Sequence, residues 1–362
     1  MVPALQCSLG VLWCVCLAAG HRGLEDGESL MQAALATPDP VITATSEWTG
    51  TRRKDAGAVP ADKPAFASVE PSQPLALLDV AHVHDPRPVP VDTMRSIVPA
   101  EKNMLEYKVG SDMIIYGFNA TKDRSISAAL ARGELWEGSL SDEFCQFLKA
   151  VKGPADFVDV GANIGTWTVP LARCLRAHGQ GGKVVAVEGV PLIAEYLEAS
   201  VVRNNLTDIV DVYSYVAGSE TVVSGGVVGE SPDNVTISLH PTNKGASSIL
   251  HRGRASSSVR ASMTTVDAIL SRYSPRVLGI KLDVEGYEGH VLKGARRLLE
   301  NPPCLLSIEV NSLWLESAGT PESEVLGLLR SAGYNVPRVA GGPQFTDTFL
   351  QADLGRCLAR FQ

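Results

Sequence analysis

A short strand, a glycine turn and a helix follow one another at residues 157–178, and this unit constrains the fold more than any other part of the sequence. Residues 157–160 read Phe-Val-Asp-Val, residues 161–165 read Gly-Ala-Asn-Ile-Gly, and a predicted helix at 166–178 is closed by Gly179. A glycine turn lets the backbone approach a ligand, and the following helix start offers free N–H groups. We therefore expect a ligand site at this turn.

Predicted strands and helices alternate along the rest of residues 104–340. Further strands are predicted at 183–188, 209–216, 277–283 and 305–310, and further helices at 191–204, 266–273, 287–300 and 323–332. An apolar run at 113–116 and a predicted helix at 141–151 precede the glycine turn. Strands that alternate with helices indicate an α/β fold, with a doubly wound, mainly parallel sheet and helices on both faces.

Four segments are predicted along the 362-residue chain. Residues 1–20 are apolar, carry no charged side chain and end in Ala-Ala-Gly, which is typical of a signal peptide; an uncleaved membrane anchor at residues 2–20 is the competing interpretation. Residues 21–103 are rich in proline and lack a hydrophobic period, which predicts a disordered stem. Residues 104–340 are the predicted folded domain, and residues 341–362 a C-terminal tail.

The leader predicts entry into the secretory pathway, with a lumenal or secreted product that stays membrane-anchored if the leader is not cleaved. Organelle targeting by a bipartite leader is the alternative. Sequons for N-glycosylation begin at Asn119, Asn205 and Asn234. Asn234 is expected to be exposed, and Asn205, at the end of a predicted helix, to be shielded.

The charge balance and the cysteine spacing argue against a nucleic-acid partner and against a zinc site. The net charge is −8, which argues against nucleic acid as a partner because phosphate binding needs a basic surface. The cysteines outside the leader are Cys145, Cys174, Cys304 and Cys357, and their spacing does not match a zinc site. One disulfide in an oxidising lumen and four buried thiols are both left open.

Polar residues lie where the first two predicted strands end, which is where open α/β sheets bind ligands. Asp159 is expected to take the amino group of a ligand, directly or through water. Gly161, Asn163 and Gly165 belong to the turn that approaches the ligand. Glu188 ends the second strand, where a carboxylate can accept hydrogen bonds from both hydroxyls of a ribose.

Two later strand ends complete the expected site. Ala217 lies in the run Tyr-Val-Ala-Gly, whose small side chains leave room for an adenine ring. Asp283 and Glu285 end another strand in the run Lys-Leu-Asp-Val-Glu-Gly-Tyr-Glu, close to the expected reaction centre. Glu288 is interpreted as a carboxylate that stabilises a helix start, and His290 as a packing or surface histidine.

These motifs resemble those of FkbM-type methyltransferases. The matching runs are FVDVGANIGTWT, VVAVEG, TTVD, IKLDVEGYEGHVLKGA and LLSIEVN, in that order. The resemblance implies a Rossmann-like class I fold, S-adenosyl-methionine as cofactor and a hydroxyl of a glycan or small molecule as acceptor. It implies cofactor contacts for Asp159, Gly161, Asn163, Gly165 and Glu188, and places beside the reaction centre for Asp283 and Glu285. VEG stands where the family more often has FEP, which leaves Glu188 intact but changes the adenine-side packing.

The predicted mechanism is direct transfer of a methyl group to a hydroxyl. Asp283 is the first candidate for the base that accepts the hydroxyl proton, and Glu285 the second. No metal is predicted, because no ligand spacing requires one. The alternatives are a catalytically inactive secreted binding module with the same fold and a nicotinamide-dependent oxidoreductase. The missing third glycine of the dinucleotide fingerprint argues against the oxidoreductase.

The acceptor pocket is expected to come from two variable segments. One is the segment before the glycine turn, and the other is the Ser/Gly-rich insertion at 219–262. Val235, Ile237 and Leu239 alternate with polar residues in this insertion, which predicts one strand of a hairpin.

Overall fold

The computed structural model describes residues 86–219, 234–240, 242–243, 247, 249, 257–273, 276–336 and 345–362. The predicted leader at 1–20 and most of the predicted stem at 21–103 lie outside the described residues.

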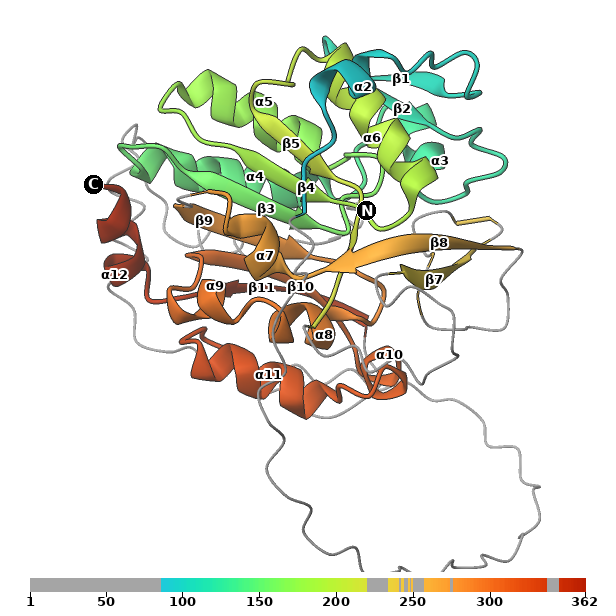
Figure 1. The fold of residues 1–362 in the computed structure, drawn as a ribbon. Helices are drawn as coiled ribbons and strands as arrows, with labels where there is room; N and C mark the ends of the chain where they lie inside the picture. Colours follow the sequence, from blue (N-terminus) through green and yellow to red (C-terminus); the bar gives the residue numbers. More distant parts are fainter. Residues whose placement is uncertain are drawn as a thin grey trace, which may run out of the picture. The chain divides into compact units, whose positions relative to one another are not determined.

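A six-stranded sheet forms the centre of the fold, in the order β11-β10-β9-β3-β4-β5 (Figure 1). Its strands are β3 (Asp156–Val160), β4 (Val184–Val187), β5 (Val210–Tyr213), β9 (Val277–Leu282), β10 (Leu305–Asn311) and β11 (Phe345–Gln351). All neighbouring pairs are parallel except β10 with β11. The chain builds outward from β3 to β5, then returns to the other side of β3 with β9. The strand order therefore reverses between β3 and β9, which is where such sheets bind ligands.

Helices cover both faces of this sheet, as the sequence predicted. α4 (Gly138–Phe147), α5 (Thr168–His178) and α6 (Pro191–Arg203) lie on one face, and α8 (Glu288–Lys293), α9 (Arg296–Glu300) and α11 (Glu322–Ser331) on the other (Figure 1). Successive strand residues point to opposite faces. Phe157 accordingly packs in one buried cluster and its neighbour Val158 in a second. The doubly wound, mainly parallel fold is thus confirmed.

Smaller elements surround the sheet. β1 (Leu105–Val109) and β2 (Met113–Gly117) form an antiparallel hairpin, and a second sheet has the order β6-β8-β7. The strands of this second sheet are β6 (Val216–Ala217), β7 (Asn234–Leu239) and β8 (Ser257–Thr264). The remaining helices are short, namely α2 (Val91–Arg95), α3 (Ile126–Ala131), η1 (Leu148–Ala150), α7 (Val266–Leu270), α10 (Ser312–Ser317), α12 (Leu354–Leu358) and η2 (Ala359–Phe361). β7 pairs antiparallel with β8, so the predicted hairpin strand is confirmed. The predicted strand at 209–216 is instead divided between two sheets.

The fold extends beyond both predicted boundaries. β11 lies within the predicted tail at 341–362, yet it pairs with β10 along its whole length, so this segment is part of the sheet. At the other end, the Val89 N–H donates a hydrogen bond to the Val212 carbonyl oxygen at 2.7 Å. The predicted limits at 104 and 340 are therefore too narrow, because an edge strand and a short helix give weak periodic signals.

The helix predicted at 287–300 is two helices, α8 and α9, and Gly294 follows the last residue of the first one. A Cβ atom at Gly294 would lie 2.0 Å from the carbonyl oxygen of Gly218. The α8 end thus packs directly on the backbone that follows β6, and only glycine permits this approach.

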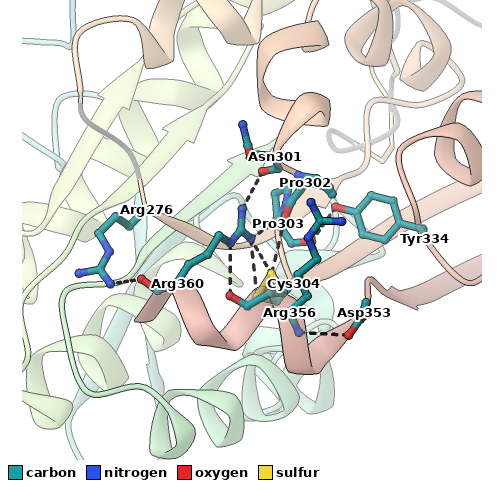
Figure 2. Close-up of a disulfide and its surroundings, with 10 residues drawn as sticks. Arg276, Asn301, Pro302, Pro303, Cys304, Tyr334, Asp353, Arg356 and Arg360 are labelled. Carbon is teal, nitrogen blue, oxygen red and sulfur yellow. Dashed lines mark hydrogen bonds between the residues drawn. A yellow bond between two sulfur atoms is a disulfide. The ribbon is translucent and has the colours of Figure 1, made fainter. Parts of the chain in front are cut away.

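All four described cysteines form disulfides. Cys145 in α4 pairs with Cys174 in α5, with Cα atoms 6.1 Å apart, and Cys304 pairs with Cys357 in α12, with Cα atoms 5.5 Å apart. Figure 2 shows Arg360 beside the second disulfide, where its guanidinium donates to the carbonyl oxygens of Asn301 at 3.0 Å and Pro302 at 2.7 Å. The C-terminus is therefore fastened to the start of β10.

The sequon at Asn205 is exposed. The prediction that it is shielded is wrong, because α6 ends at Arg203 and Asn205 lies in the turn beyond it, with φ 55°. Asn119 is also exposed, and its Oδ1 accepts a hydrogen bond from the Thr121 hydroxyl at 2.7 Å. The Asn234 side chain lies outside the described residues. Among the helices that the structure describes, none has both the length and the apolar character needed to cross a bilayer.

Candidate active site

A cavity of about 290 Å³ opens at the carboxyl ends of β3, β4, β9 and β10. Its wall includes most of the residues predicted for the site, namely Gly161, Asn163, Glu188, Ala217, Asp283 and Glu285. Ser125, Ile126, Trp136 and Glu137 come from the segment before β3, and Ile237, Asn243, Ser247 and Ile249 from the insertion. The two segments predicted to build the acceptor pocket thus both reach this cavity.

Two close contacts require glycine at Gly161 and Gly165 in the turn after β3. Gly161 has φ 85°, and a Cβ atom there would lie 1.7 Å from the Asp283 carbonyl oxygen. Gly165 has φ 93°, and its Cβ would lie 2.7 Å from the Leu197 side chain. Larger residues would push the turn away from β9 and from α6. Gly161 lines the cavity, whereas Gly165 serves the packing behind it.

Glu188 joins the end of β4 to the glycine turn. One carboxylate oxygen accepts a hydrogen bond from the Asn163 N–H at 2.9 Å, and the other from the Val190 N–H at 2.8 Å. The side chain is only 7% exposed, and burial raises its pKa to about 7 although both hydrogen bonds lower it. The carboxylate is held in one orientation on the cavity wall.

Asp159 lies beneath the turn and is not among the residues that line the cavity. It is fully buried, and its carboxylate accepts a hydrogen bond from the Thr168 hydroxyl in α5. Burial raises its pKa to about 6, against the opposing effect of the Lys281 ammonium. The structure therefore gives Asp159 a place behind the turn. Its contact with the amino group of a ligand, directly or through water, stays a prediction.

Asp283 stands at the end of β9, directly across the strand-order switch from β3. Its N–H donates to the Val160 carbonyl oxygen at 3.0 Å, and its carboxylate accepts from the Lys281 ammonium at 2.8 Å. Lys281 also forms an ion pair with Glu137 at 3.4 Å. Burial lowers the pKa of Lys281, but the surrounding carboxylates raise it by more, so the ammonium stays charged.

Glu285 follows in a tight loop that Glu288 holds in place. Glu285 adopts a left-handed conformation with φ 58°. One oxygen of Glu288 accepts from the N–H groups of Val284 at 3.0 Å and Gly286 at 3.1 Å. Glu288 is fully buried, and this burial raises its pKa to about 7. Glu288 therefore holds the backbone of this loop through two hydrogen bonds. The sequence predicted only that its carboxylate stabilises a helix start.

The sequence segment that supplies most of these residues also matches a known family. Residues 159–336 match the sequence model of the Methyltransferase FkbM domain. They belong to the FkbM methyltransferase family. The matched span holds the glycine turn, Glu188, Ala217 and the Asp283 loop, so the resemblance predicted from the sequence is confirmed.

Solved methyltransferase structures resemble the FkbM domain only distantly. An FkbM methyltransferase from Methylobacillus flagellatus is 18% identical, with a TM-score of 0.34 over 57% of this chain and 49% of that chain. A SAM-dependent O-methyltransferase from Thermotoga maritima is 13% identical, with a TM-score of 0.29 over 59% and 64%. A SAM-dependent methyltransferase from Aquifex aeolicus is 18% identical, with a TM-score of 0.31 over 61% and 89%. This chain thus spans about half the length of the Methylobacillus protein. No curated protein matches it.

Several residues in or near the cavity were not predicted from the sequence. Trp136, Glu137, Glu309 and Trp314 line the cavity, and Lys281 lies just behind it. Lys281 could have been noticed, because a lysine within the apolar run Val-Leu-Gly-Ile-Lys-Leu must find buried partners. The others carry no local signal, since only the folded chain brings them together.

His290 has the packing role that the sequence favoured. Its ring stacks on that of Tyr287, with centroids 4.2 Å apart, and its Nε2 contacts the Ala318 carbonyl oxygen at 2.8 Å. It is not among the cavity-lining residues. Across the described part of the FkbM domain, no group of acidic, histidine or cysteine side chains has an arrangement that would hold a metal ion.

Proposed function

We propose that this protein is an S-adenosyl-methionine-dependent methyltransferase that methylates a hydroxyl oxygen of a glycan or small molecule. The observation that carries the proposal is the position of Glu188 beside the Gly161 turn, on a cavity at the strand-order switch. Membership of residues 159–336 in the FkbM family supports the same reaction class.

The cavity residues fit the proposed cofactor. Each Glu188 oxygen accepts one backbone N–H, and a carboxylate oxygen has capacity for a second hydrogen bond. Glu188 can therefore accept from two ribose hydroxyls while the backbone holds it. Asn163 lies beside it, and the small Ala217 side chain leaves room for an adenine ring. When bound, S-adenosyl-methionine supplies a methyl group already activated on a sulfonium sulfur.

The chain's own residues position the acceptor and take its proton. Methyl transfer needs the acceptor oxygen held in line with the methyl group and its leaving sulfur, so orientation provides much of the rate. The hydroxyl proton moves to the Asp283 carboxylate as the new carbon–oxygen bond forms. Lys281 fixes the direction of that carboxylate through the 2.8 Å contact. Glu285 is the second candidate for this proton.

Transfer of label tests this proposal directly. The full chain is incubated with methyl-labelled S-adenosyl-methionine and fractionated cell extract, and methylated products are identified by mass spectrometry. We expect label in a hydroxylated product of at least one fraction. Cofactor binding without label in any fraction would instead favour the inactive binding module, and label on nitrogen or carbon would contradict O-methylation.

We also propose that the protein acts in a lumenal or extracellular compartment. Two disulfides in the described part of the chain support this proposal, because disulfides persist where conditions are oxidising. The expressed full chain should shift in mobility after N-glycosidase treatment. An unshifted product that still begins at Met1 would contradict the proposal and leave the methyltransferase assignment untouched.

A further inference from the structure

Backbone strain in the described chain is concentrated at the cavity. Five residues other than glycine have positive φ, and three of them, Glu137, Asn163 and Glu285, line the cavity. Asparagine tolerates this conformation through local hydrogen bonds, but glutamate has no such compensation. Strained residues persist only where surrounding contacts hold them, and such residues cluster at functional sites. The contact that holds Glu137 is therefore of interest.

An ion pair with Lys281 holds the Glu137 side chain. Its backbone has φ 57° and ψ 29°, and it immediately precedes α4. Its carboxylate forms an ion pair with the Lys281 ammonium at 3.4 Å, and the Lys281 side chain is only 7% exposed. Lys281 belongs to β9, a fully buried strand of the central sheet. A rigid element thus fixes the side chain of a strained turn.

This strained turn carries a tryptophan onto the cavity wall. Trp136 directly precedes Glu137, lines the cavity, and remains 43% exposed. The turn belongs to the segment before β3, whereas Asn163 and Glu188, proposed for the cofactor, follow β3 and β4, and Ala217 lies in β6. Trp136 therefore belongs to a segment of the cavity wall to which no cofactor contact is assigned, and we place the acceptor against it. An aromatic ring there offers a flat apolar surface to the acceptor.

We propose that Glu137 is a positioning residue for the acceptor, because its ion pair with Lys281 holds the left-handed turn that keeps Trp136 on the cavity wall. The same ammonium also binds Asp283 at 2.8 Å. One buried cation therefore fixes both the proposed base and the turn that shapes the acceptor pocket. The inference rests on the proposed function for its effect on catalysis, but its effect on the turn is independent of any activity.

Two substitutions at Glu137 separate positioning from plain stability. Glu137→Gln removes the ion pair and keeps the strain, so the turn should open. Glu137→Gly removes the ion pair and also relieves the strain, because glycine adopts positive φ at no steric cost. The glycine variant should therefore melt at or above the temperature of the glutamine variant and keep more of the function, because its turn does not need the ion pair to offset strain. Substituting Lys281 is less informative, since it would leave several carboxylates without their buried cation.

Glu134→Gln is the matched control. Glu134 lies three residues earlier and pairs with Arg132 at 2.8 Å, with both side chains more than half exposed. Exposed ion pairs contribute little. This variant should behave as wild type in every measurement, which would show that the effect belongs to the buried pair.

The measurement is amide hydrogen exchange of residues 135–138 in the full-length variants, followed by label transfer. Glu137→Gln should exchange faster there, and its extract concentration for half-maximal label transfer should rise roughly 5- to 30-fold, the change expected for losing a contact that offsets left-handed strain. Glu137→Gly should show a smaller change in both measurements. S-adenosyl-homocysteine affinity should stay at the wild-type value. Unchanged exchange in Glu137→Gln, or weakened cofactor affinity with unchanged acceptor dependence, would overturn the inference. Absence of label transfer by the wild type would remove the proposed function and leave the exchange result standing.

Discussion

At the residue scale, Glu188 is the side chain on which cofactor recognition depends most. Glu188→Gln should weaken S-adenosyl-homocysteine binding by about 1–3 kcal/mol, the cost of an acceptor lost to buried hydroxyls. Glutamine keeps the size of the side chain, but its amide NH₂ group would meet the N–H of Asn163 or Val190 as a second donor. Calorimetry on the folded variant measures the change. Wild-type affinity would count against the ribose role.

Asp283 should matter in the transition state more than in binding. Asp283→Asn keeps the shape of the side chain but cannot accept the acceptor proton, so label transfer should fall by about 10²–10⁴-fold. Cofactor affinity should change far less, since a base contributes after the substrates are bound. Single-turnover assays and calorimetry on the same variant separate the two effects. Wild-type turnover in this variant would move the role to Glu285 or to orientation alone.

Local sequence patterns located some site residues and not others. Glu188 and Asp283 could be predicted because each follows an apolar strand, and strand ends are where such sheets bind ligands. Asp159 fits the same pattern but lies behind the turn, and its contact with Thr168 depends on how α5 packs. Glu137 and Trp136 are far from any motif in the sequence. They line the cavity only in the folded chain, and the ion pair between Glu137 and Lys281 joins residues far apart in the sequence, which no periodicity encodes.

At the element scale, Gly294 fixes the junction between α8 and α9. Gly294→Ala should destabilise the protein by about 1–3 kcal/mol or more, because the new Cβ would overlap the Gly218 carbonyl oxygen and force backbone to move. Gly327→Ala in α11 is the control, since a Cβ there meets nothing within 4 Å. That change should stabilise the protein by about 0.5–1 kcal/mol. Chemical denaturation compares them, and equal stability of the two variants would refute the packing argument.

Most elements of the central sheet could be predicted, while the edges could not. β4 is a continuous apolar run, and β3 is apolar apart from Asp156 and Asp159, as expected of largely buried parallel strands. β11 pairs antiparallel at an edge of the sheet, and its local sequence pattern did not distinguish it from a tail. The Cys304–Cys357 disulfide then fastens α12 beyond it. Which cysteines pair is a property of the three-dimensional fold, and sequence spacing left it open.

At the scale of the whole molecule, buried carboxyl groups should make stability fall as the pH rises. Burial raises the pKa of four of them, to about 6 for Asp159 and about 7 for Glu188, Glu198 and Glu288. Their values are 3.8 and 4.5 in the unfolded chain. The folded state therefore binds more protons across this interval, and the free energy of unfolding decreases with pH there.

Denaturant titrations of the cofactor-free protein check this prediction. Stability should be greatest near pH 4.5 and should decline toward about pH 7, where these groups ionise. Saturating S-adenosyl-methionine should reduce the decline, because its positive charge favours the ionised form of Glu188. A free energy of unfolding that rises steadily over the same interval would contradict the burial of these carboxylates.

The central claim is that the cavity between the Gly161 turn, Glu188 and the Asp283 loop binds S-adenosyl-methionine. Titration calorimetry of the full-length protein with S-adenosyl-methionine, S-adenosyl-homocysteine and NAD tests it most directly. We predict one site per chain for each of the first two ligands, weakened in Glu188→Gln, and no measurable binding of NAD. Failure of both adenosyl ligands to bind the folded protein, or tighter binding of NAD, would contradict the account.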